Sequence, residues 1–208
     1  MDQAEQLRNI VKKSQQLVPK AQIFTVTSGK GGVGKSNTVV NLAVQMQKRG
    51  KRVIIFDADF GLANVEIMFG AIPRYNLSDL IYRGKALQEI ITPGPMDVGF
   101  ISGGSGITGV NNLTRDQLRF LVQSLSELDS LADIIIIDTG AGISDSVLEF
   151  VTASPEVLLV VTPEPSSMTD AYSLLKAMHR NKEFLQSQTK VKVILNRVVS
   201  EEEGKSIF

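Results

Sequence analysis

A glycine-rich run between a predicted strand and a predicted helix constrains this 208-residue chain more than any other feature. The run extends from Thr27 to Ser36 and fits the pattern G-x-x-x-x-G-K-S. An apolar, β-branched stretch at 23–27 leads into it, and residues 37–49 have helical spacing with Gly50 as a stop signal. Backbone N–H groups of such a loop bind phosphate oxygens, because glycines permit close approach. The run therefore predicts a nucleotide-binding loop.

Three side chains of this loop have predicted roles. Lys35 is expected to reach the outer phosphates, and the hydroxyl of Ser36 to ligate Mg²⁺. Lys30 follows the first glycine and is poorly placed to serve its own nucleotide, so we expect it to reach a nucleotide in a facing subunit. This expectation makes the ATP-bound state a dimer. The predicted ATP-binding residues here are Gly29, Lys30, Gly31, Gly32, Val33, Gly34, Lys35, Ser36 and Asn37.

Strand-like and helix-like patterns alternate beyond this loop. Further strands are predicted at 53–56, 98–101, 134–137, 157–161 and 191–195. Helical stretches are predicted at 77–91, 114–129, 144–153 and 167–186. Continuous Ile/Val runs without polar alternation indicate strands that are buried on both faces. The predicted fold class is therefore α/β, a doubly wound, mostly parallel sheet with helices on both faces, whose ligands bind beyond the carboxyl ends of the strands.

Two carboxylates follow the second predicted strand. Asp57 at the strand end is expected to hold a Mg²⁺-bound water, and Asp59, in a loop with Gly61, to orient or deprotonate the water that attacks the γ-phosphate. With Lys30 and Lys35, Asp59 completes the predicted catalytic set. The alternative is a loop or helix-capping carboxylate, since acidic residues commonly begin helices.

Asp138 ends a run of four isoleucines and fits a Walker B strand. Mg²⁺ prefers an octahedron of waters and a few carboxylates, so Ser36, Asp57 and Asp138 form the predicted metal set, and the predicted cofactors are Mg²⁺ with ATP or ADP. Gly140 and Gly142 would let the following loop move as a switch. Capping of the helix at 144–153 is the alternative role for Asp138.

Two further segments follow predicted strands. Asn196 offers an amide that could pair with the adenine edge, and with Arg197 it joins the predicted ATP-binding set; a plain turn is the alternative. The segment 162–167 indicates a rigid loop that leads into a capped helix, at the nucleotide or dimer face. His179 lies among basic residues and receives no role.

The composition excludes several classes of protein. Lys+Arg and Asp+Glu are both 22, so no global field draws the chain to nucleic acid, and none is expected as a partner. The chain has no cysteine, which excludes disulfides, thiol nucleophiles and cysteine-held metal centres, and fits a cytoplasmic location. No stretch approaches the roughly 20 apolar residues that span a bilayer.

The two ends of the chain differ from this pattern. Residues 1–20 form a polar segment that is separate from the predicted ATPase domain at 21–208. Its apolar residues on one predicted helical side are Leu7, Ile10, Val11, Leu17 and Val18. After the last predicted strand, only 196–208 remain, and an uncovered parallel strand would expose apolar surface. We therefore expect that the domain lacks its C-terminal part.

The loop at 30–36, the segment 57–64 and the segment 138–142 together resemble the deviant Walker A, switch I and switch II motifs of the MinD/ParA ATPases. This resemblance covers about residues 22–197. It implies an ATP-dependent, face-to-face homodimer in which Lys30 of each chain contacts the phosphates of the other. It also implies that Asp59 positions the attacking water and that hydrolysis separates the dimer.

The first residues are similar to the activator segment of one branch of this family, the FlhG group, which governs flagellar number and placement. The residues that carry this similarity include Asp2, Gln3, Leu7 and Arg8. The resemblance implies stimulation of the signal-recognition-type GTPase FlhF, with Gln3 entering its active site, and further contacts with flagellar basal-body components. Family members bind the inner face of the cell membrane peripherally, when ATP-bound, through a C-terminal amphipathic helix. No such helix occurs before Phe208.

Other functions remain open on the sequence alone. A DNA-partition ATPase of the ParA type, or another MinD-like positioning ATPase, would share the three motifs. An iron–sulfur electron donor of the nitrogenase reductase type would need cysteine ligands, which the chain lacks. A non-enzymatic scaffold could use both lysines and Asp59 as a binding switch without turnover.

Overall fold

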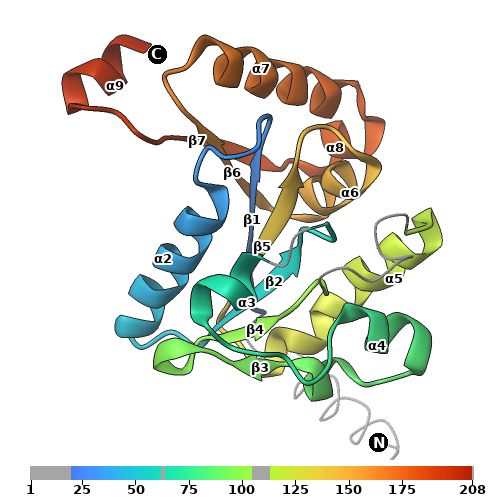
Figure 1. Ribbon diagram of the computed structural model, residues 1–208. Coiled ribbons are helices and arrows are strands. Elements are labelled where there is room, and N and C mark those ends of the chain that lie inside the picture. Colours follow the sequence, from blue (N-terminus) through green and yellow to red (C-terminus); the bar gives the residue numbers. More distant parts are fainter. Residues whose placement is uncertain (1–19, 62–63, 105–112, 208) are drawn as a thin grey trace, which may run out of the picture.

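The fold is an α/β sandwich around one mostly parallel sheet (Figure 1). The computed structural model describes residues 20–61, 64–104 and 113–207. Within these residues the sheet has seven strands in the order β3-β4-β2-β5-β1-β6-β7, and only β3 runs antiparallel to its neighbour. The strands are β1 Gln22–Ser28, β2 Val53–Ala58, β3 Thr92–Pro93, β4 Gly99–Ile101, β5 Ile134–Ala141, β6 Glu156–Val161 and β7 Lys190–Leu195. The predicted doubly wound fold is confirmed.

Helices cover both faces of this sheet, with α2 on one side and α5 and α6 on the other (Figure 1). The α-helices are α2 Lys35–Lys48, α3 Asn64–Phe69, α4 Leu77–Arg83, α5 Arg115–Ser124, α6 Asp145–Ala153, α7 Pro165–Arg180, α8 Lys182–Ser187 and α9 Glu201–Ile207. The 3₁₀ helices are η1 Leu87–Ile90, η2 Pro95–Asp97 and η4 Leu125–Ser130. In β5, Ile134 and Ile136 pack on the α2 side, while Ile135 and Ile137 pack on the opposite side. This alternation explains the unbroken isoleucine run, because both faces are buried.

Three predicted helices are wrong in extent. The one at 77–91 ends as an α-helix at Arg83, since Gly84 takes a left-handed conformation with φ 65°. The one at 114–129 becomes a 3₁₀ helix from Leu125 onward. The one at 167–186 divides at Asn181, whose side chain accepts hydrogen bonds from the backbone N–H groups that begin α8. The elements α3, β3 and α9 were not predicted.

The N-terminal segment lies outside this description. Residues 1–19, with the predicted partner-activating residues Asp2, Gln3, Leu7 and Arg8, are outside the described residues, so their predicted role stays a prediction. The sheet begins at Gln22, whose N–H donates to the carbonyl of Asp133 at 2.9 Å. Among the helices that the structure describes, none is long and apolar enough to cross a membrane.

Candidate functional site

The carboxyl ends of the central strands converge on one pocket. The parallel register places Asp57 of β2 directly opposite Asp138 of β5, and Asp138 opposite Val26 of β1. The loop after β1 closes over this edge before α2 begins at Lys35. A pocket of about 570 Å³ opens here. It is lined by Ser28, Gly31, Gly32, Gly34, Lys35, Ser36, Asn37, Asp59, Asn64, Ile67, Met68, Ala141 and Arg197.

Many of the predicted site residues meet at this pocket, but not all of them line it. Gly29, Lys30, Val33 and Asn196 are not among its lining residues. Asp57 and Asp138 are fully buried at the strand ends. Five lining residues had no individual role in the sequence interpretation: Ser28, Asn64 and Ala141, which lie within the three predicted motifs, and Ile67 and Met68, which lie outside them. Three of these five belong to α3, whose six residues are too few to establish a helical period.

Backbone geometry explains why the loop needs two of its glycines. Gly34 has φ 93°, a conformation that L side chains rarely adopt, and a Cβ there would lie 2.4 Å from the amide nitrogen of Asn196. At Gly29 a Cβ would lie 2.2 Å from the backbone carbonyl carbon of Asp170, because α7 passes directly against the loop. These contacts fix the path of the loop between α7 and the end of β7.

Asn196 and Arg197 hold this loop from outside. The Asn196 amide nitrogen donates to the carbonyl of Val33 at 2.8 Å, and the Arg197 guanidinium donates to the carbonyl of Gly32 at 2.7 Å. Arg197 also lines the pocket and has φ 62°. This contact uses one of the two N–H groups of the Asn196 amide, so the predicted pairing of that amide with an adenine edge stays a prediction. Both residues therefore shape the loop in this structure.

Lys35 and Asp138 form a buried ion pair, with 2.6 Å between Nζ and Oδ1. Burial raises the pKa of Asp138, and Lys35 and the Ser36 hydroxyl oppose that rise. The other carboxylate oxygen of Asp138, Oδ2, is buried without a hydrogen-bond partner among the described residues. The helix-capping alternative for Asp138 is wrong, because Ser144 caps α6.

An oxygen such as Asp138 Oδ2 fits a hydrated divalent cation. No group of three or more His, Cys, Asp or Glu side chains that could enclose a metal occurs in the described parts of the chain. Mg²⁺ usually keeps several waters and is held by one or two carboxylates together with phosphates. The donor set of Ser36, Asp57 and Asp138 therefore suits Mg²⁺ that arrives with a nucleotide, rather than a resident metal in a protein cage.

Asp57 connects the strand end to the following loop and helix. One of its carboxylate oxygens accepts from the N–H of Asp59 at 3.1 Å, and the other from the N–H of Val65 at 3.4 Å. Val65 is the second residue of α3, so the buried Asp57 carboxylate also accepts from an N–H group in the first turn of that helix. Burial, followed by the negative charge of Asp138, raises the pKa of Asp57 well above its usual range.

Asp59 is the carboxylate that faces the pocket. Its Oδ1 accepts from the N–H of Gly61 at 3.4 Å, and its Oδ2 accepts from the amide of Asn64 at the same distance. Asp59 is half-buried, so water can reach it. Asn64 orients the carboxylate from the first turn of α3, and the sequence interpretation had given it no role.

Lys30 lies beside the pocket and contacts α7 of its own chain. Its Nζ donates to Glu164 at 2.9 Å and to the hydroxyl of Ser166 at 2.7 Å. The side chains of Lys30 and Glu164 are 36% and 53% exposed, so the pair is at the surface. The hydrogen bond from Lys30 lowers the pKa of Glu164. The loop at 162–167 thus supplies the resting contact of this lysine, and its predicted reach to a facing subunit stays a prediction.

Residues 24–208 match the family model of the CobQ/CobB/MinD/ParA nucleotide binding domain. The chain belongs to this family, as the fold and the loop at the end of β1 lead one to expect. It is similar to the antiactivator FleN of Pseudomonas aeruginosa, with 41% identity over 90% of this chain and 65% of FleN. It is also similar to the flagellum site-determining protein YlxH of Helicobacter pylori, with 38% identity over 90% of this chain and 62% of YlxH.

Solved structures share the same architecture. The MinD cell division protein of Aquifex aeolicus has a TM-score of 0.71 at 25% identity, with 89% of this chain and 73% of that chain covered. The septum site-determining protein MinD from Pyrococcus horikoshii, solved with Mg-ADP, has a TM-score of 0.70 at 22% identity over 90% of this chain and 77% of that chain. The chain spans a little under two thirds of the length of FleN and of YlxH.

Proposed function

We propose that this chain is a Mg²⁺-dependent ATPase that works as a dimerising switch. One observation carries the proposal: the glycine-rich loop, Lys35 and Asp59 all line one pocket. Asp138 is buried beside Lys35. Loop N–H groups bind the phosphates, and Lys35 moves from Asp138 to the outer phosphates. Mg²⁺, held by Ser36, Asp138 and Asp57, would supply charge neutralisation at the β- and γ-phosphates.

The water is positioned by Asp59, whose carboxylate is held toward the pocket by Asn64 and Gly61. Lys30 acts on the nucleotide of a second chain, so turnover needs two chains face to face. For this, Lys30 leaves Glu164 and Ser166, a surface contact that costs little to break. Hydrolysis removes the γ-phosphate, and the two chains then separate.

The cellular role that we propose is the control of flagellar number and placement. Its support is the similarity to FleN and YlxH, whose names refer to flagellar control, at 41% and 38% identity. The N-terminal segment would stimulate the GTPase FlhF through Gln3, flagellar basal-body components would be further partners, and the ATP-bound dimer would associate peripherally with the inner face of the membrane. Nucleic acid is not a proposed partner, because the net charge of the chain is zero.

A single-turnover ATP assay that compares the wild type with Asp59→Ala tests the catalytic part. The account expects ATP to bind in both and the hydrolysis rate to fall by about 10² or more in the variant. Asn41→Ala, on the exposed side of α2, is a matched control that should hydrolyse at the wild-type rate. Unchanged hydrolysis by Asp59→Ala would eliminate the assigned role.

GTP hydrolysis by purified FlhF, with and without this chain, tests the partner part. We expect the wild type to accelerate GTP turnover and Gln3→Ala to lose that effect while it keeps its own ATPase activity. An equal effect of both chains on FlhF would show that Gln3 has no such role.

A further inference from the structure

A groove lies at the end of the sheet opposite to the nucleotide pocket. We call it the basal groove; it has a volume of about 540 Å³, and its lining includes Val53, Ile54, Gln88, Ile91, Pro93 and Leu131. Val53 is the first residue of β2, whose other end carries Asp57. Leu131 is 37% exposed and contributes apolar surface to the groove. The groove is thus an apolar surface remote from the proposed ATP chemistry.

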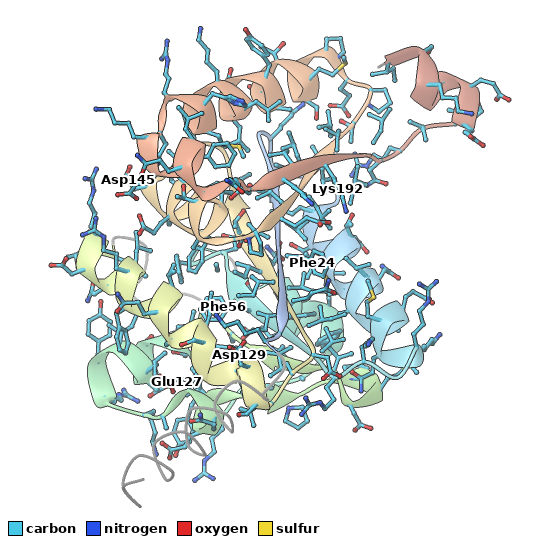
Figure 2. The ribbon with its side chains drawn as sticks, turned by 180° about the vertical axis from the view of Figure 1, so that it is seen from behind. Phe24, Phe56, Glu127, Asp129, Asp145 and Lys192 are labelled. Atoms are coloured by element: carbon cyan, nitrogen blue, oxygen red, sulfur yellow. The ribbon has the colours of Figure 1, made fainter. Side chains whose placement is uncertain are left out.

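The described chain begins beside this groove. The N–H of Ala21 donates to Asp129 at 3.0 Å, two residues before Leu131. Gln22 donates to the carbonyl of Asp133, and Asp133 in turn forms an ion pair of 2.8 Å with Arg52, which lines the groove. Figure 2 shows Glu127 and Asp129 low in the view, and Asp145 toward the other end of the molecule. Residues 1–19 therefore join the fold close to the groove.

The geometry points to the N-terminal segment, residues 1–19, as the occupant of the basal groove. We propose that the segment docks there within its own chain and is withheld from other partners while docked. A segment attached at the rim has an effective concentration in about the millimolar range, so weak apolar contacts suffice to hold it. As a helix of 19 residues it would extend about 28 Å, enough to enter the groove with its apolar residues.

The charges of the two surfaces favour this occupant. Arg52 is compensated by Asp133, whereas Asp97 at the groove forms no ion pair with any residue that the structure describes. The segment has more basic than acidic side chains: Arg8, Lys12 and Lys13 against Asp2 and Glu5. An apolar segment with a small excess of positive charge therefore complements the groove.

This inference deepens the proposed function, because the docked segment is the one assigned to FlhF. Docking at the groove would make the activating residues available only after release. The docking itself requires neither ATP hydrolysis nor FlhF, so it can be tested without them.

Cross-linking between engineered cysteines tests the docking directly, since the chain has none of its own. Val11→Cys on the segment is combined with Gln88→Cys in the groove, and a short bifunctional maleimide is added to the full chain at low concentration. The matched control combines Val11→Cys with Glu127→Cys, an exposed site near the same attachment point but outside the groove lining. We expect at least a fivefold higher yield of internally cross-linked monomer for Gln88→Cys. Equal yields would overturn the proposal.

A third change, Leu131→Glu, is added to both pairs. It should lower the Gln88→Cys yield to that of the control, with only a small decrease in the thermal unfolding temperature, because Leu131 is already partly exposed. A yield that Leu131→Glu does not affect would contradict docking. Cross-links that form mainly between molecules would mean that a second copy occupies the groove, which would also overturn the proposal. If Gln3→Ala lost the stimulation of FlhF but no groove cross-link formed, the docking proposal would be wrong and the proposed function would still hold.

Discussion

The two lysines of the glycine-rich loop occupy different electrostatic environments. Lys35 is 8% exposed and bound to the fully buried Asp138, whereas Lys30 is bound to the exposed Glu164. Breaking a buried pair is strongly destabilising because one charge stays uncompensated, but a surface pair contributes little. Lys30 can therefore change partners with little effect on folding, which a lysine that acts on a second chain requires.

Lys30→Ala should separate turnover from stability. By analogy with residues that act in trans on a transferring phosphoryl group, the ATP turnover rate should fall by about 10³ or more, while ATP still binds. The thermal unfolding temperature should barely change, since the lost ion pair is at the surface. Steady-state ATPase assays and thermal unfolding measure the two effects.

Lys192→Ala is the matched control for this substitution. It removes a comparable surface ion pair, with 2.6 Å to Glu156, on the edge strand β7. It should change neither ATP turnover nor stability. If Lys30→Ala kept its ATP turnover, the proposed action on a second chain would be refuted.

Asp57 should make stability depend on pH in the absence of nucleotide. Its folded-state pKa is raised by burial and by Asp138, so the folded chain binds a proton that the unfolded chain releases as pH increases. Stability therefore falls as pH rises from the ordinary carboxyl range, near 4, toward the raised pKa. Asp57→Asn should therefore stabilise the nucleotide-free protein more at pH 7 than at pH 4. Denaturant unfolding at the two pH values measures this, and an equal gain at both would contradict it.

At the scale of elements, the packing of α7 against the loop is a point of high constraint. A Cβ at Gly29 would lie 2.2 Å from the backbone carbonyl carbon of Asp170, so either the loop or α7 would have to move. Gly29→Ala should destabilise the fold by about 1–3 kcal/mol, the range for overpacked sites, and weaken ATP binding. Denaturant unfolding and nucleotide titration are the measurements.

Gly31→Ala is the control within the same loop, because a Cβ there would have no atom within 4 Å. Its effect on stability should stay within about 0.5 kcal/mol. Similar losses for both variants would show that the loop tolerates no side chain at all, independently of α7.

The elements themselves show how far the sequence predicts this fold. Six of the seven strands that the structure describes were predicted, because buried parallel strands are continuous apolar runs such as Ile134–Ile137. The two-residue strand β3 and the six-residue helix α3 are too short to show a strand or helix period in the sequence. The helix α3 was therefore not predicted, and Asn64 and the apolar α3 residues received no role at the pocket. The break at Asn181 depends on one side-chain cap. The contact of Lys30 with Glu164 joins residues 134 positions apart, which no local pattern can indicate.

At the scale of the whole molecule, two exposed apolar residues of α3 lie at the nucleotide pocket. Ile67 and Met68 line it and are 75% and 38% exposed, and Lys30 lies beside it. A second chain across the pocket would cover these side chains and receive Lys30. This agrees with the proposed dimer, in which nucleotide and partner are held by the same surface.

The mass of the chain in solution, with ADP and with ATP, tests this account most directly. Light scattering on Asp59→Ala, which should retain ATP unhydrolysed, is expected to give a monomer of 22.6 kDa with ADP and twice that mass with ATP. Adding Lys30→Ala to Asp59→Ala should return the ATP sample toward the monomer. A monomer under every condition, with ATP shown to be bound, would contradict the central claim that the nucleotide joins two chains through Lys30.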